Sequence, residues 1–460
     1  MTTSSDALNN IWNCGGLPPD ALPHAILTGV DPVLPSSFAV GAAAQAAINA
    51  GALAACELGH VRGQARQDVS VDMQHAALEC SGWFSVNGRV PDGWDKFSGL
   101  YRCADGWVRI HANFEHHRVG AMRLLGLNPA TAQRADGERE LLTWKALDFE
   151  QAAADGGLVV AAFRSFDQWD KHPQGQAVAA LPLMRFERIA DAPRRELPAL
   201  NADNRPLTGV RVLDLTRILA GPVCGRALAA YGADVMLVNS PHLPNIESIA
   251  DTSRGKLSVH VDLKTAYGQD ALKRLLADAH VFVQGYHPSG LDSLGFAPHA
   301  LADQHPGIVC ISLSAYGEAG PWSNRRGFDS LVQTTTGFNH AEALAAGSSE
   351  PKPLPMQILD YATGHLMAFA VAAALRKQAT EGGSWHVRLS LAQTGYWLRG
   401  LGRIDNGFAI ERPDRAPYLE TAKSGFGELV GFAHSAKFSR TPSCWARPSM
   451  PPGTHPSIWP

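Results

Sequence analysis

The stretch VRVLDLTRILAGPVCGRALAAYGADVMLVN, residues 210–239, contains two short apolar runs on either side of a helix-like segment. The runs at 210–216 and 233–239 are rich in Val, Leu and Met, which is typical of strands covered on both faces. The small-residue segment at 221–232 predicts a helix between them. The stretch therefore predicts a strand–helix–strand unit of a parallel sheet.

The same alternation of strand and helix signals continues along the chain. Three more strands are predicted at 257–263, 281–286 and 308–316, with a second helix at 267–279. The predicted fold class is α/β, with a doubly wound parallel sheet that binds ligands at the carboxyl ends of its strands. TRILAGP follows the first strand where a dinucleotide-binding protein carries GxGxxG, so a nicotinamide dehydrogenase is not expected. The chain also has no GxSxG segment of an α/β-hydrolase.

Charge and hydropathy exclude two classes of partner. The chain has 460 residues, 18% of them charged, and a formal net charge of −3, so a nucleic-acid partner is not expected. The longest apolar stretch, 38–56, is mostly Ala and Gly and is interrupted by Gln45 and Asn49. It fits a packed core helix better than a bilayer span, so no membrane partner is expected either.

Cysteine usage indicates the compartment. The seven cysteines are scattered and form no CxxC pair, which predicts reduced thiols and no zinc site. The first ten residues lack the basic and apolar regions of a secretory leader. We therefore expect a cytoplasmic protein. His116 and His117 are adjacent but have no third ligand nearby in the sequence, so they are interpreted as solvated loop residues rather than as a metal site.

A weak internal repeat shapes the domain organisation. Residues 38–79 and 359–397 both read as a small-residue helix, a glycine-containing turn, an alternating strand and the start of a second helix. The repeat predicts an N-terminal extension (1–32) followed by a degenerate partial repeat of the large domain (33–90). A small α+β domain (91–200) and the large domain (205–403) come next, and a Pro-rich arm laid on the surface (404–460) ends the sequence.

Asp360 is unexpected in its context, because LPMQILDYATGHLMAFAVAAALRK (354–377) is otherwise an apolar helix. One interpretation is a helix N-cap, since Asp accepts a hydrogen bond from a free backbone N–H at that position. The internal repeat permits a second interpretation, in which Asp360 is catalytic. Asp360 falls opposite 40–42 of the first copy, which has no carboxylate there, and a catalytic Asp is needed in only one copy.

Five segments in order, at 207–238, 254–264, 290–296, 312–338 and 383–395, resemble the family III CoA-transferases. This family includes formyl-CoA transferase, the carnitine CoA-transferase and the acyl-CoA racemases. GLYRCADGWVRI (99–110) and FDQWDKHPQGQAV (166–178) look like the small domain of that family, which normally follows the large one but precedes it here. The resemblance implies a Rossmann-like large domain in a fused or permuted order. It also implies a homodimer, which is interlocked in the family.

The resemblance implies a role for Asp360 as the nucleophile that forms an anhydride and then an aspartyl-CoA thioester. The substrates would be an acyl-CoA and a carboxylic acid, with no permanently bound cofactor and no metal. The contacts to coenzyme A implied by the same resemblance are Arg217, Arg254, Lys256, Tyr286, His287, Tyr316 and Gly317.

Two alternatives to CoA transfer stay open. An acyl-CoA racemase or epimerase moves a proton at the α-carbon with a His in the motif that reads RGFD here, but Phe328 occupies that position and cannot move a proton. A non-catalytic CoA-binding homologue would keep the fold without the chemistry. The acyl donor and acceptor are not predicted.

Overall fold

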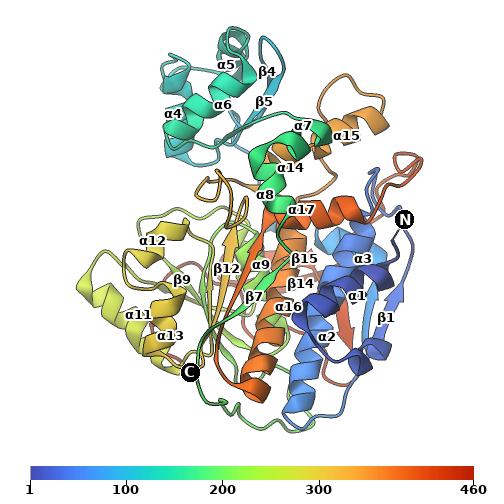
Figure 1. The fold of residues 1–460 in the computed structure, drawn as a ribbon, viewed down its shortest axis with the longest axis vertical. Helices are drawn as coiled ribbons and strands as arrows, with labels where there is room; N and C mark the ends of the chain where they lie inside the picture. The colour runs from blue at the N-terminus through green and yellow to red at the C-terminus, as the bar shows by residue number, and fades with distance from the viewer. Residues whose placement is uncertain (1) are drawn as a thin grey trace.

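The computed structural model describes residues 2–460, and a seven-stranded sheet forms its centre (Figure 1). The strand order is β10-β9-β8-β11-β12-β13-β7. All neighbouring strands are parallel except β7, which pairs antiparallel with β13. The strands are β7 (Arg185–Ala190), β8 (Arg211–Leu215), β9 (Asp234–Asn239), β10 (Leu257–His260), β11 (Val281–Gln284), β12 (Val309–Ser314) and β13 (Ser384–Ser390). The predicted α/β class with a parallel sheet is confirmed.

Helices cover both faces of this sheet, which explains why its strands read as continuous apolar runs. On β11 and β12, Val283 and Ile311 belong to the core that includes α9 and α16, whereas Phe282 and Cys310 belong to the core that includes α11 and α13. The helices of this part are α9 (Ala220–Ala230), α10 (Ile249–Thr252), α11 (Ala266–Asp278), α12 (Pro288–Asp292), α13 (Pro298–Gln304), α14 (Asp329–Thr336), α15 (Phe338–Ala345), α16 (Ile358–Glu381) and α17 (Leu391–Gly400).

The N-terminal segment packs against α16 through its longest helix, α2 (Figure 1). A Cβ on Gly51 of α2 would lie 3.2 Å from the carbonyl oxygen of His365, so the two helices approach closely. The elements of this segment are α1 (Ser4–Gly15), η1 (Pro19–His24), β1 (Ala25–Thr28), α2 (Val40–Val61), β2 (Val69–Asp72), α3 (Met73–Glu79) and β3 (Phe84–Val86). The order α2–β2–α3 repeats the order α16–β13–α17.

A separate small body carries the three-stranded sheet β4-β5-β6 with its own apolar core (top of Figure 1). Strand β7 lies within the predicted small-domain segment 91–200 but completes the edge of the large sheet, since its backbone pairs with β13. The other elements between residues 91 and 200 are β4 (Gly99–Arg102), β5 (Trp107–Ile110), α4 (Glu115–Leu124), α5 (Arg134–Leu141), α6 (Ala146–Asp155), β6 (Val160–Ala162), α7 (Phe166–Lys171) and α8 (Pro173–Ala179).

The C-terminal segment contains more regular structure than a Pro-rich arm. It forms η2 (Ala416–Tyr418), β14 (Leu419–Ser424), β15 (Gly427–Phe432) and β16 (Ala436–Phe438). These strands pair with the N-terminal segment, β15 with β3 and β16 with β2. The last residues cross the large domain without regular structure, and the indole of Trp459 donates to the carbonyl of Leu275 at 3.0 Å.

Within residues 2–460, α16 is the one helix long and apolar enough to span a membrane. All of its most apolar window is buried inside the protein, as in a core helix.

Candidate functional site

Asp360 lies in the first turn of α16 but does not cap it. The N-cap residue is Gln357, and its side chain makes no capping hydrogen bond. Asp360 is 6% exposed, and its carboxyl accepts a hydrogen bond from the backbone N–H of Ala220, the first residue of α9. The carboxyl therefore faces the N-terminus of a neighbouring helix, where backbone donors favour negative charge.

The cap of α16 comes from Asp329, the first residue of α14. Its Oδ2 accepts the backbone N–H of Asp360 at 2.9 Å, and the N–H of Leu359 also donates to this carboxyl. The Nε2 of Gln333 donates to its Oδ1 at 2.5 Å. Asp329 thus satisfies the free donors at the start of α16, and the carboxyl of Asp360 is not needed for that purpose.

The first copy of the repeat has the same cap without the second carboxyl. The carboxyl of Asp31 accepts the backbone N–H of Gly41 at 3.2 Å and of Ala42 at 2.8 Å, at the start of α2. Ala42 is the third residue of α2, as Asp360 is the third residue of α16. A helix of this kind therefore forms with alanine in place of Asp360.

Burial raises the pKa of Asp360 well above its usual value, and the neighbouring charge of Asp329 raises it further. Burial also raises the pKa of Asp329 to about 7, against the opposite effect of the hydrogen bonds it accepts. Two buried carboxyls that repel each other do not both ionise readily, so the pair holds a proton near neutral pH.

Comparison with known proteins identifies the fold that carries this pair. Residues 207–415, which include both carboxyls, match the sequence profile of CoA-transferase family III. This part of the chain is a CoA-transferase family III domain. An acyl-CoA transferase of Gibberella moniliformis is 28% identical over 80% of this chain and 73% of its own length. A probable fatty acyl-CoA transferase of Mycobacterium tuberculosis is 34% identical over 50% of this chain and 61% of its own. A crystal structure of the mycobacterial protein covers 43% of this chain and 56% of that one, at 33% identity and a TM-score of 0.41.

Three of the coenzyme A contacts predicted from the sequence lie near one another, at the carboxyl ends of the strands. Tyr286 and His287 line a cavity of 210 Å³ between the ends of β8, β9, β10 and β11. Burial raises the pKa of Tyr286 to about 12. Arg217 follows β8, donates to the carbonyl of Pro244 and interacts electrostatically with Tyr286. The side chain of Asn239 also lines the cavity, and neither its nitrogen nor its oxygen has a partner among residues 2–460.

Arg254 and Lys256 do not face this cavity, because their charges are satisfied inside the protein. Lys256 is fully buried and donates at 2.8 Å to both the carboxyl of Asp214 and the carbonyl of Pro222. Arg254 pairs with Asp251 and with Glu420, and stacks on Trp445.

Tyr316 and Gly317 lie in a third place. Tyr316 is 2% exposed and packs edge-on against Trp322, with ring centres 5.1 Å apart. Gly317 lines a separate cavity of 320 Å³.

Sequence reasoning missed several residues beside the carboxyl pair. Asp329 follows Phe328 in the RGFD motif, and that motif was the signal that could have identified it. His111 of the small domain stacks on Phe328 at 3.9 Å, and Arg109, two residues earlier, interacts electrostatically with Asp329. Alternation along the extended backbone from 109 to 111 places the side chains of Arg109 and His111 on one face. It does not reveal that this face packs against the start of α14.

The adjacent histidines lie at the start of α4 rather than in a loop. His116 is exposed, whereas His117 is buried against Phe114 and neither of its ring nitrogens has a hydrogen-bond partner in the described part of the chain. Burial lowers the pKa of His117 to about 4, so its ring is neutral near pH 7. Residues 2–460 contain no group of three or more His, Cys, Asp or Glu side chains that could hold a metal ion.

Asp329→Asn is expected to move the acid limb of the pH profile to lower pH. A carboxylate nucleophile acts when deprotonated, so kcat/KM rises as pH increases through its raised pKa. Removing the neighbouring negative charge lowers that pKa, whereas the Asn oxygen can still accept the N–H of Asp360. The measurement is kcat/KM for an acyl-CoA between about pH 5 and 9.

Asp31→Asn is the matched control, because it alters the equivalent cap of α2 where no second carboxyl is present. It should leave the limb in place. An unmoved limb in Asp329→Asn would show that Asp329 does not influence the titrating group.

Proposed function

We propose that the chain transfers coenzyme A from an acyl-CoA to a carboxylic acid, with Asp360 as the nucleophile. The observation that carries this proposal is the spare carboxyl. Asp329 already caps α16, yet the chain keeps Asp360 buried and directed at a backbone N–H of α9. Burying a carboxyl without a structural use costs stability, which is a common property of reacting groups.

The proposed reaction has four steps. The carboxylate of Asp360 attacks the thioester carbonyl, a C–O bond forms, the C–S bond breaks, and a mixed anhydride and CoA thiolate result. The thiolate attacks the aspartyl carbonyl, forming aspartyl-CoA and releasing the first acid as its carboxylate. The acceptor carboxylate attacks this thioester and displaces CoA thiolate. The thiolate then attacks the acyl carbonyl of the new anhydride, which yields the new acyl-CoA and restores Asp360.

The surroundings of Asp360 support this chemistry in two ways. Burial limits access of water, which would hydrolyse an anhydride. The N–H of Ala220 supplies a fixed donor for negative charge on an oxygen. A Cβ on Gly364 would lie 2.6 Å from the carbonyl oxygen of Ala220, so the glycine permits α9 to approach α16 closely enough to present this donor.

We place the adenosine end of coenzyme A in the cavity at the strand ends, beside Tyr286 and Asn239. Lys264, which lines this cavity, is exposed and available to a phosphate, and Arg217 lies in the loop that connects β8 with α9. A racemase is disfavoured by Phe328, whose ring carries no proton to exchange. The predicted homodimer and cytoplasmic location stay predictions.

The test is intact-protein mass spectrometry of the wild-type chain after incubation with acetyl-CoA, benzoyl-CoA and longer acyl-CoAs. We expect a mass increase of one coenzyme A with loss of water, which hydroxylamine removes and peptide mapping assigns to the segment containing Asp360. An adduct on another residue would refute the assignment. Absence of any adduct, together with exchange of the α-proton in deuterated water, would support the racemase instead.

A further inference from the structure

Arg109, on β5 of the small domain, is a buried cation that has no ion pair in the described part of the chain. Its side chain is 8% exposed, its Nε makes no hydrogen bond, and within residues 2–460 its guanidinium forms no ion pair. Leaving a charge buried and unpaired costs several kcal/mol, so buried arginines are nearly always paired or hydrogen-bonded. The unused donors of Arg109 therefore indicate an anion that comes from outside the chain.

The position of Arg109 relates this anion to the nucleophile. Arg109 and Asp329 influence each other electrostatically, and Asp329 accepts the N–H of Asp360 at 2.9 Å. Directly after this strand, His111 stacks on Phe328, and its Nδ1 also lacks a hydrogen-bond partner in the described chain. An anion bound at Arg109 would thus lie beside the first turns of α14 and α16, on the side of the small domain.

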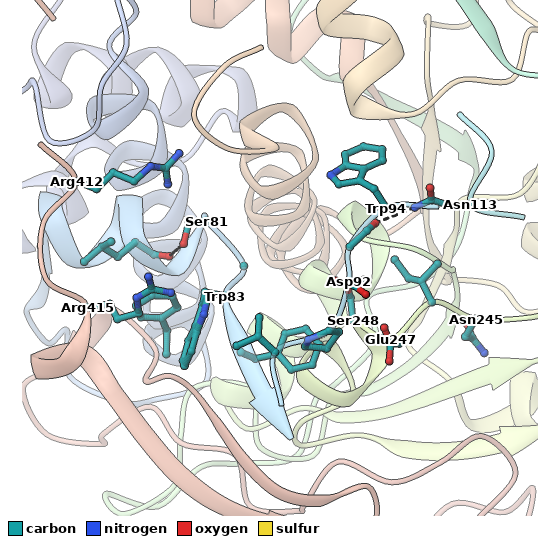
Figure 2. A pocket seen from close by; sticks show the side chains of 18 of the residues that line it. Ser81, Trp83, Asp92, Trp94, Asn113, Asn245, Glu247, Ser248, Arg412 and Arg415 are labelled. Carbon is teal, nitrogen blue, oxygen red and sulfur yellow. Dashed lines mark hydrogen bonds between the residues drawn. The ribbon is translucent and has the colours of Figure 1, made fainter. Parts of the chain in front are cut away.

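Trp94 connects Arg109 with a large cavity. The guanidinium carbon of Arg109 lies 4.8 Å from the centre of the Trp94 ring, and Trp94 also lines a cavity of 590 Å³. Figure 2 shows Trp94, Asn113 and Asp92 on one side of this cavity and Trp83, Ser81 and Arg415 on the other. Phe84 and Phe432 add aromatic surface. Cavities of about 300–1,000 Å³ hold drug-sized ligands, so a two- to four-carbon acid would leave most of this one unfilled.

The same cavity is close to the start of α16. A Cβ on Gly82, which lines the cavity, would collide with the hydroxyl of Tyr361, the residue after Asp360. Arg412, which lies on the same side of the cavity as Ser81 and Trp83 (Figure 2), donates at 2.7 Å to the carbonyl of Pro355, just before α16. This side of the cavity therefore contacts the segment that carries the nucleophile.

We propose that Arg109 binds the carboxylate of the acceptor acid, and that the cavity beyond Trp94 holds the body of that acid, an aromatic or alicyclic ring system. This inference rests on the proposed CoA transfer and names the class of acid that receives coenzyme A. A planar guanidinium can bind a carboxylate through two parallel hydrogen bonds, which orients it as well as holds it. The exposed face of Trp94 offers a stacking surface for a ring.

The test is calorimetric titration of the full chain with 2-naphthoate and, for comparison, succinate. Wild type should bind naphthoate more tightly than succinate, and Arg109→Gln should weaken naphthoate binding by about ten-fold or more. Arg102→Gln, an exposed arginine on the neighbouring strand β4, is the matched control and should bind as wild type does. Equal naphthoate binding by Arg109→Gln and wild type, or tighter binding of succinate, would overturn the proposal.

Asp360→Asn separates this inference from the proposed reaction. The variant should still bind naphthoate, because the acid site does not need the nucleophile. If wild type binds naphthoate through Arg109 but never forms aspartyl-CoA, the acid site stands and the transfer mechanism fails. If aspartyl-CoA forms but Arg109→Gln leaves both naphthoate binding and the KM for the acceptor unchanged, the acid site fails and the mechanism stands. Arg109→Lys keeps the charge and provides the comparison if Arg109→Gln does not fold; it should bind naphthoate less tightly than wild type.

Discussion

Asp360→Ala is expected to lower kcat for CoA transfer by about 10³-fold or more, because no other group can form the aspartyl thioester. The same variant should unfold at a free energy within about 1 kcal/mol of wild type, or higher. Asp329 still caps α16, and the variant no longer buries a second carboxyl beside it. The measurements are steady-state transfer kinetics and chemical denaturation on the same preparations.

The paired readout distinguishes the two interpretations of Asp360. A helix cap would show the opposite pattern, a loss of about 1 kcal/mol in the free energy of unfolding with activity retained in the folded fraction. Asp360→Glu supplies the control for position. It keeps the carboxylate but displaces it by one methylene from the N–H of Ala220, so it should remain well below wild type in kcat.

Lys256→Met is expected to lower the free energy of unfolding by about 3–5 kcal/mol, because it leaves Asp214 buried without its counter-charge. The ammonium of Lys256 lies 2.8 Å from the Asp214 carboxyl, and both side chains are almost fully buried. The KM for acyl-CoA should not change, since Lys256 has no surface to offer a phosphate. Urea denaturation and the KM of the folded protein test the two parts of this expectation.

The double variant Asp214→Leu/Lys256→Met is the control, because replacing both charges with apolar groups removes the unpaired carboxyl and should recover much of the loss. Lys264→Ala provides the contrast. Lys264 is exposed at the cavity beside Tyr286, so its loss should raise the KM for acyl-CoA with little effect on stability. If Lys256→Met raised the KM for acyl-CoA without lowering stability, Lys256 would be a coenzyme A contact, as the sequence resemblance implied.

Local pattern predicted the large sheet well because its strands are covered on both faces. Apolar residues then occupy consecutive positions, as in β9, and the helices between them carry their own periodicity. The match of 38–79 to 359–397 also has a structural counterpart, since the first turns of α2 and α16 are each capped by the carboxyl of an Asp that precedes the helix in the chain. Strands β14 to β16 were not predicted. β15 and β16 each pair with an N-terminal strand that no local pattern reveals, and β14 pairs only with β15.

The sequence alone was sufficient for the α/β class and the family resemblance. It also led to the hypothesis that Asp360 is the nucleophile, because a single carboxylate is unusual in so apolar a segment. Only the tertiary structure decided how the other charges are used. Lys256 turns inward where Gly225 leaves room for its ammonium, and Asp329 caps a helix that begins about 30 residues later in the chain. Arg109 interacts electrostatically with Asp329, but its Nε makes no hydrogen bond within residues 2–460. The chemistry that a side chain can perform follows from its type and its spacing in the sequence. Its burial and its partners depend on contacts between segments that are far apart in the chain.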